Sequence, residues 1–215
     1  MHSATSSFCI GNALVLRVMM MELSRGALLA RGGAALLAGS SLGALVGAAQ
    51  AATPPDGDLA YARLFVASEL LALDFYRKAI ASRQFAGAEL RSLWLARADE
   101  REHYRSSAKV LTDAGQVPAT AADIDFTYPR GAFGSRRAIA QLGTRLETLF
   151  VAAYLGAVGG YQTEALKELA ARAAASEAQH LSLFAGEVGG RRVGPAFPRP
   201  LPIDKVSDAL DAYTS

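Results

Sequence analysis

The sequence predicts an all-α protein, a four-helix bundle of two antiparallel helix hairpins with a long crossover between the second and third helices and an extended C-terminal tail. Apolar residues recur with helical periodicity from residue 59 to residue 188. One long interruption, from Gln116 to Gly134, lies midway along that pattern. A motif of glutamate and histidine recurs in both halves. Two repeated helix hairpins account for all three observations.

The first two helices are expected at residues 59–82 and 86–114. The first has a broad apolar face, and Asp58 is its expected N-cap. Gly115 is expected to end the second helix, because glycine readily adopts the left-handed conformation found at helix C-termini. The short link between the two helices predicts an antiparallel hairpin.

The third helix is expected from Ser135 to Gly159–Gly160, and the fourth from Thr163 to Val188, again with a short link. The segment between the hairpins contains Pro118 and Pro129 and is not expected to be helical. Its length would let it run along the whole bundle, as a one-crossover bundle requires. We therefore expect the bundle domain at residues 58–188.

The C-terminal tail, residues 189–215, contains four prolines between Pro195 and Pro202. Proline favours extended backbone, so we expect this segment to lie as a strap on the bundle surface. A short helix is expected at Asp204–Tyr213.

The N-terminal residues 1–51 are expected to be a leader with an export signal. Arg25 and Arg31 precede an uncharged apolar stretch, and Ala49-Gln50-Ala51 supplies a cleavage site before Ala52. The apolar stretch is shorter than the ~20 residues of a membrane-spanning helix, so no permanent membrane anchor is expected. We expect a periplasmic or extracellular protein, exported by Sec or Tat; a buried N-terminal helix is the alternative.

The run Met19–Met21 suggests that translation begins there, which would leave residues 1–18 outside the natural protein.

The charge balance and the sulfur content exclude some kinds of partner and ligand. Three of the 22 basic and one of the 20 acidic residues precede position 52, so 19 of each remain and their formal charges cancel. No nucleic-acid partner is expected from this balance.

Beyond Met21 the chain has no cysteine or methionine, which excludes thiolate ligands and disulfides there. A protein that handles peroxide or oxygen would suit this composition; compositional chance is the alternative.

Two glutamate–histidine pairs and two lone glutamates predict a metal site. In each pair the histidine follows a glutamate by three residues, so both side chains lie on one helix face. A lone glutamate with apolar neighbours precedes each pair by about thirty residues. This set, spread over four helices, is the ligand set of a di-metal carboxylate site. The predicted ligands are Glu69, Glu100, His103, Glu147, Glu177 and His180. Solvated glutamates and ordinary core or surface histidines are the alternative.

A tyrosine follows each lone glutamate by seven residues, close to two helical turns: Tyr76 after Glu69 and Tyr154 after Glu147. The two halves therefore have a pseudo-twofold pattern. We expect these hydroxyl groups to orient the ligating carboxylates at a catalytic centre; packing as core aromatics is the alternative.

The spacing of these residues resembles the ferritin-like superfamily, in particular its di-iron and di-manganese branches. The resemblance implies that Glu100 and Glu177 bridge two divalent ions. It implies that Glu69 and Glu147 bind one ion each, and that each histidine binds one ion through a ring nitrogen. Iron is the first expected metal and manganese the second.

The segment Phe126–Phe133 resembles the crossover of exported bacterial ferritin-like proteins, some of them called desiccation-related. Rubrerythrins differ, because they carry a further carboxylate where this chain has Phe150, and a four-cysteine module. A bacterioferritin-type haem would need a methionine, which the expected mature chain lacks.

The resemblance therefore implies a ferroxidase or catalase-like oxidoreductase in stress defence, with Fe(II), oxygen or peroxide as small-molecule substrate. The alternative is a non-catalytic stress- or desiccation-related protein that binds metal or has a structural role. A monomer or dimer is expected rather than a cage.

Overall fold

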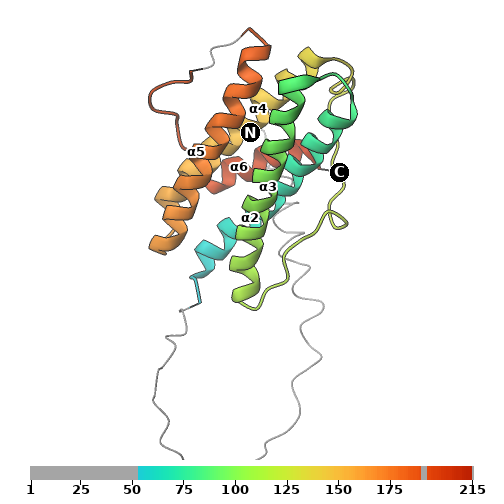
Figure 1. The fold of residues 1–215 in the computed structure, drawn as a ribbon. Helices are drawn as coiled ribbons and strands as arrows, with labels where there is room; N and C mark the ends of the chain where they lie inside the picture. Colours follow the sequence, from blue (N-terminus) through green and yellow to red (C-terminus); the bar gives the residue numbers. More distant parts are fainter. Residues whose placement is uncertain (1–52, 190–192, 215) are drawn as a thin grey trace, which may run out of the picture.

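The computed structural model describes residues 53–189 and 193–214, which form four long helices and one short one (Figure 1). They are α2 (Asp56–Ala81), α3 (Gly87–Asp113), α4 (Arg136–Gly160), α5 (Glu164–Glu187) and α6 (Ile203–Leu210), followed by a 3-10 turn at Asp211–Tyr213. No β-strand occurs in this part of the chain. The predicted all-α class is confirmed. The expected leader and its cleavage site at Ala51/Ala52 lie outside the described residues.

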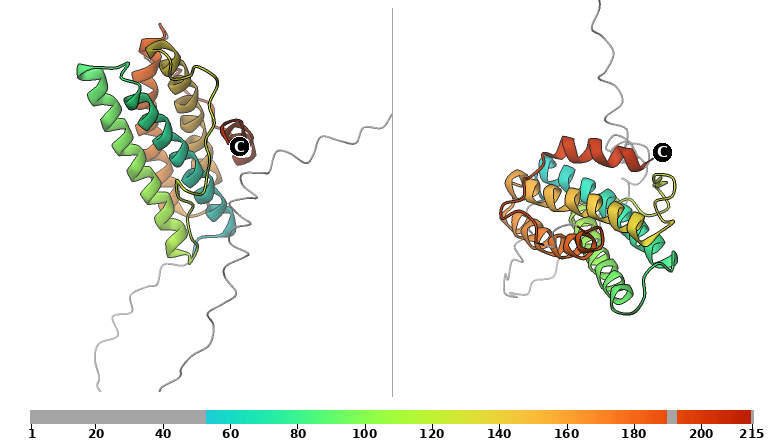
Figure 2. Two further views of the ribbon diagram at one scale, coloured as in Figure 1. Left: turned by 90° about the vertical axis from the view of Figure 1, so that its right-hand side faces the viewer. Right: turned by 90° about the horizontal axis from the view of Figure 1, so that it is seen from above.

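Two antiparallel hairpins build the bundle: α2 packs along α3, and α4 packs along α5 (Figures 1 and 2). The segment between α3 and α4 has no helix and runs along the length of the bundle, as predicted. The predicted end of the second helix is also confirmed. Gly115 has φ +75°, and the Gln116 N–H donates to the Leu111 carbonyl over 2.8 Å, which closes the last turn.

The N-cap prediction for Asp58 is wrong. Helix α2 begins at Asp56, and Pro55 occupies the cap position. The buried Asp58 carboxylate instead accepts hydrogen bonds from the backbone N–H groups of Gln162 (2.8 Å) and Thr163 (3.0 Å), just before α5. Burial raises the pKa of Asp58, but these hydrogen bonds outweigh it and hold the pKa below its ordinary value. Asp58 thus fixes the start of α5 to the other hairpin.

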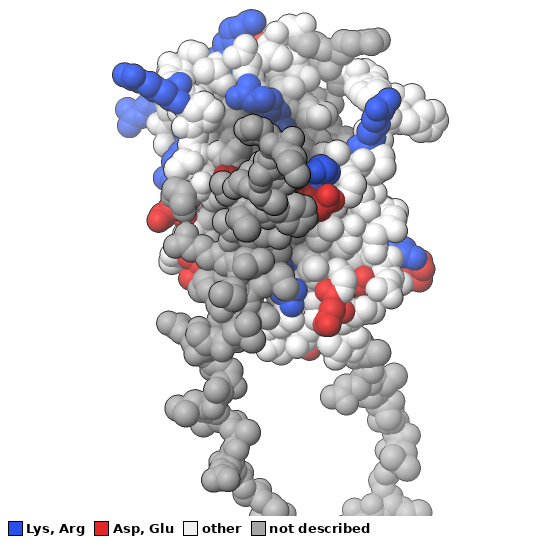
Figure 3. Space-filling view, turned by 180° about the vertical axis from the view of Figure 1, so that it is seen from behind, with Lys and Arg blue, Asp and Glu red and all other residues white. Residues whose placement is uncertain are grey.

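The core fills the space between the four long helices with aromatic and aliphatic side chains. In α2, Phe65 and Phe75 lie on either side of Glu69 along the helix, and both are buried. The Glu69 carboxylate therefore lies in an apolar part of the bundle. Among the described residues, no helix is both long enough and apolar enough to cross a bilayer. On the face seen in Figure 3, basic and acidic side chains are both present among uncharged ones.

The tail passes over the outside of the bundle and ends in α6, which crosses α2 and α4 (Figure 2). Residues 193–202 have no regular secondary structure, as expected of an extended segment. The Leu201 N–H donates to the Ala152 carbonyl of α4 over 2.9 Å, and Val206 and Leu210 of α6 are buried. The Thr127 N–H donates to the Tyr213 carbonyl, which joins the tail to the crossover.

We predict that Gly156→Ala detaches the tail from α4, because a Cβ atom at Gly156 would lie 1.9 Å from the Leu201 carbonyl oxygen. Overpacking of this kind destabilises by about 1–3 kcal/mol. Gly159→Ala is the control, since a Cβ there meets no atom within 4 Å. It should be neutral or stabilising by up to ~1 kcal/mol. Thermal unfolding and limited proteolysis of residues 193–202 measure both effects; equal behaviour of the two variants would contradict the prediction.

Candidate metal centre

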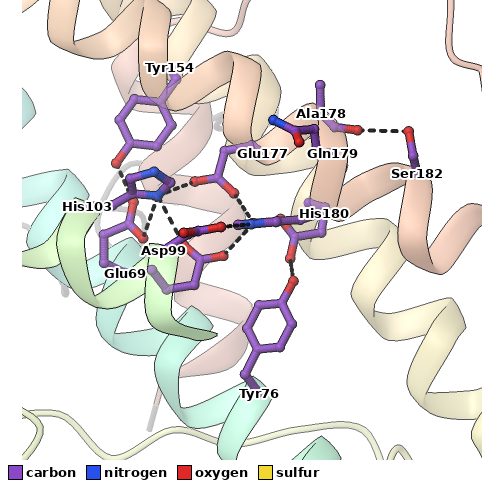
Figure 4. Close-up of polar contacts among 12 residues, drawn as sticks. Glu69, Tyr76, Asp99, His103, Tyr154, Glu177, Ala178, Gln179, His180 and Ser182 are labelled. Carbon is purple, nitrogen blue, oxygen red and sulfur yellow. Dashed lines mark hydrogen bonds and ion pairs between the residues drawn. The ribbon is translucent and has the colours of Figure 1, made fainter. Parts of the chain in front are cut away.

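The structure brings all six predicted ligands together in the middle of the bundle (Figure 4). They are Glu69 from α2, Glu100 and His103 from α3, Glu147 from α4, and Glu177 and His180 from α5. The four carboxylates are at most 1% exposed. Charged groups this deep in an apolar core require compensating charge or hydrogen bonds.

Two overlapping sets of side chains can each surround one ion, with ligand atoms within 4.8 Å of one another. The first set is Glu69, Glu100, His103 and Glu177, and the second is Glu100, Glu147, Glu177 and His180. Glu100 and Glu177 belong to both sets. The geometry therefore offers two adjacent positions that share two carboxylates, and each position adds one further glutamate and one histidine.

Both histidines direct Nδ1 into the cluster. Within its own helix, His103 Nδ1 lies 3.3 Å from Glu100 Oε2, and His180 Nδ1 lies 3.1 Å from Glu177 Oε2. Across the bundle, His103 Nδ1 lies 2.9 Å from Glu177 Oε1, and His180 Nδ1 lies 3.0 Å from Glu100 Oε1. Each imidazole thus contacts both shared carboxylates, so Nδ1 is the nitrogen available to an ion.

The two tyrosines hold the two unshared glutamates, and the pairing is crossed. Tyr76 of α2 donates its hydroxyl hydrogen to Glu147 Oε1 of α4 over 2.5 Å, and Tyr154 of α4 donates to Glu69 Oε1 of α2. Each tyrosine therefore serves the glutamate of the other hairpin rather than its own. Burial, followed by the nearby carboxylates, raises the pKa of both tyrosines well above the ordinary value, so both stay protonated donors.

Protons balance the charges in the metal-free cluster. Burial, reinforced by Glu100 and Glu177, raises the pKa of Glu69 and Glu147 well above its ordinary value. Burial alone would lower the histidine pKa values, but hydrogen bonds to Glu100 and Glu177 raise them to about 11 for His103 and about 12 for His180. Two imidazolium groups can therefore balance the negative charge of the carboxylates in the absence of metal.

The donor set fits a pair of metal ions. In Glu69 and Glu147, Oε1 accepts the tyrosine hydrogen bond, while Oε2 has no hydrogen-bond partner among the described residues. Each of these Oε2 atoms lies 3.9 Å from the histidine Nδ1 of its own set. A buried carboxylate oxygen without a partner is costly, and a bound cation would satisfy it. Carboxylate with imidazole suits iron, manganese or zinc.

Asp99 is a further residue of the site that was not among the residues predicted from the sequence. Its Oδ2 lies 3.3 Å from His180 Nε2, where it accepts the ring N–H (Figure 4). That hydrogen bond leaves Nδ1 unprotonated for an ion in the neutral ring. The signal in the sequence was its position directly before Glu100, at the edge of the ligand face of α3.

A family model for a ferritin-like domain matches residues 57–189, a region that contains all six ligands and, except for the first residue of α2, all four long helices. No curated protein matches the chain at a significant level.

We predict that Asp99→Ala weakens metal binding at the His180 position by about 10–100-fold, the usual effect of losing a hydrogen bond that orients a ligand. Asp99→Asn keeps a side-chain carbonyl acceptor and should retain most of the affinity. Glu102→Ala is the control, because Glu102 is on the same helix, exposed and paired with Arg105. Titration calorimetry with Mn(II) measures the affinities. Equal affinities for Asp99→Ala and Glu102→Ala would refute the role of Asp99.

We predict that the metal-free protein loses stability as the pH rises from about 6.5 towards 11. In that window the folded chain holds the His103 and His180 protons, whereas the unfolded chain, with its ordinary histidine pKa near 6.5, has released them. Bound metal replaces these protons, so the loaded protein should lose this dependence and metal uptake near pH 7 should release at least two protons.

Thermal unfolding from pH 6 to pH 10, with and without metal, measures the first effect, and calorimetry in buffers of different ionisation enthalpy counts the protons. A metal-free protein whose stability does not change over this range would contradict the assigned proton positions.

Proposed function

The chain belongs to the ferritin-like family, and from that premise we propose that it is a di-metal oxidoreductase that oxidises Fe(II) or removes peroxide in stress defence. The observation that carries the proposal is that Glu100 and Glu177 are fully buried and shared by two four-residue ligand sets. Two positions with a common pair of carboxylates suit chemistry that uses two ions together. We propose iron as the first metal and manganese as the second.

Bound iron or manganese would supply one-electron redox chemistry at two adjacent positions. The protein residues would do three things there. The carboxylates and His103 and His180 would hold the ions, and Tyr76 and Tyr154 would keep the unshared glutamates in place. The buried rings of Phe65, Phe75 and Phe184 would keep bulk water out.

The absence of cysteine and methionine after Met21 supports small molecules as the redox partners. Without thiolates this part of the chain cannot carry an iron–sulfur or rubredoxin-type electron donor. Fe(II) itself, or peroxide reacting as both donor and acceptor, would need no such donor. We also propose that the protein acts in the periplasm or outside the cell, which rests on the leader sequence alone. We further propose a monomer or dimer that binds neither nucleic acid nor membrane.

A second candidate is a stress- or desiccation-related protein whose metal only stabilises the fold. The observation that favours it is that the six ligands come from all four long helices. Ions bound there would join both hairpins as a cross-link does, and any ligand that binds only the folded chain raises its stability.

We predict that protein purified from its native compartment contains two metal ions per chain and turns over Fe(II) or hydrogen peroxide. Glu100→Gln should lower the metal content and abolish turnover, because it removes a charged ligand shared by both positions. Glu102→Gln, with an exposed side chain on the same helix, is the matched control and should leave both unchanged. Elemental analysis, oxygen-electrode assays and thermal unfolding measure these properties.

Full metal content that raises the melting temperature, with no turnover of either substrate, would refute the oxidoreductase and favour the second candidate. Protein without metal would refute both.

A further inference from the structure

Two cavities lie between α3 and α5, one on each side of the metal centre along the helices. The first is lined by His103 and Tyr154 of the centre together with Ser106, Ser107 and Ala170. The second is lined by Leu93, Leu183 and Phe184 and contains no residue of the centre. Only the first of these cavities therefore reaches the ligands.

The pseudo-twofold pattern explains why the two cavities differ. When the sequence of α3 is aligned with that of α5 so that Glu100 corresponds to Glu177, three further pairs result. They are Ser106 with Leu183, Ser107 with Phe184, and Leu93 with Ala170. In these three pairs the first cavity has the small residue and the second the large one. Phe65 of the first cavity is the exception, because its counterpart is Gly143, against which Phe184 packs. The equivalent space beside His180 is thus filled by side chains, whereas the space beside His103 is open.

The exposure of the two histidines agrees with this difference. The His103 side chain is 14% exposed, and that of His180 is 6% exposed. His180 is also covered on its outer nitrogen by Asp99, while the ion-pair contacts of His103 to carboxylates run through Nδ1. The metal position formed with Glu69 and His103 is therefore the accessible one.

The size of the first cavity restricts its ligand. The space in which the centre of a water molecule fits measures about 20 Å³. A cavity needs about 10–15 Å³ of such space to hold one water molecule. A molecule of a few heavy atoms fits this space.

The chemistry of the wall restricts it further. No lining residue is acidic, so the wall itself offers no carboxylate to a hydrated divalent cation. The hydroxyl groups of Ser106 and Ser107 form no hydrogen bond with another described residue, although Ser68 and Ser92 donate to the carbonyl four residues earlier. Both hydroxyls can therefore bind a polar, uncharged guest.

We propose that this cavity is the binding and access site for hydrogen peroxide, which reaches the centre at its Glu69–His103 end. The assignment rests on the proposed function and adds its substrate class, its route and the end of the centre it approaches. Peroxide has the required size, no charge, and O–H groups that match the two serine hydroxyls.

The test places the large residues of the second cavity at the matching positions of the first cavity. Ala170→Leu and, as a milder change on a partly exposed residue, Ser106→Leu introduce the side chains of Leu93 and Leu183 into the first cavity. Ala185→Leu is the control, because Ala185 is a buried alanine of α5 that lines neither cavity. Metal content and melting temperature are measured for all variants.

We expect both cavity variants to keep their metal and to lower kcat/KM for hydrogen peroxide about tenfold, within the range over which mutation changes association rates. The association rate of nitric oxide with Fe(II)-loaded protein should fall similarly, since nitric oxide is also small and uncharged. Xenon should occupy the cavity in pressurised crystals of the unaltered protein and not in those of Ala170→Leu. The control should match the unaltered protein in metal content and in both rates, although its buried leucine lowers the melting temperature.

The readouts separate the two proposals. Peroxide turnover that is absent in the unaltered protein refutes the peroxide assignment and that part of the proposed function, while nitric oxide and xenon still report on the route. Unchanged nitric oxide and peroxide rates in both cavity variants would overturn the access route while leaving the oxidoreductase intact.

Discussion

The fold depends on the charge compensation of four carboxylates that gather in two overlapping clusters within an apolar bundle. Glu69, Glu100, Glu147 and Glu177 are at most 1% exposed, so solvent cannot screen their charges. The metal-free chain meets this constraint with protons on His103 and His180 and with the raised pKa values of Glu69 and Glu147. Two cations bound by the same side chains could balance these charges in place of the protons. Charge compensation therefore links the stability of this bundle to its proposed chemistry.

The same constraint explains how the two hairpins are joined. Tyr76 and Tyr154 each reach across to a glutamate of the other hairpin, and His103 and His180 each contact a carboxylate of the other helix pair. Asp58 adds a third connection by binding the start of α5. Few polar groups are buried in this core, and most of them lie where the two hairpins meet. Their pairing selects one arrangement of the hairpins, because any other would leave buried polar atoms without partners.

Periodicity and spacing made the helices and the ligands predictable from the sequence. Helical period, chain breakers and the repeated Glu-x-x-His motif were enough for the four helices, the crossover and the six converging ligands. Side chains that act across the bundle were not predictable in the same way. Asp58 was assigned to its own helix because local capping is the commonest use of such a residue, yet its carboxylate binds backbone 104 residues away. Asp99 was overlooked because its partner, His180, lies on another helix.

The departure from symmetry is where this centre acquires its individual properties. A shared pair of carboxylates requires equivalent ligands on both sides, so the six ligand positions repeat closely. Surrounding positions are under no such requirement: Asp99 corresponds to Ser176, and Ser107 corresponds to Phe184. The Phe184 ring packs so closely against Gly143 that a Cβ there would lie 2.7 Å from it. One end of the centre is consequently held and closed, while the other opens to a cavity. The two metal positions of this protein therefore differ in access, although its two halves are alike. A substrate that must approach a pair of ions from one side requires such a difference.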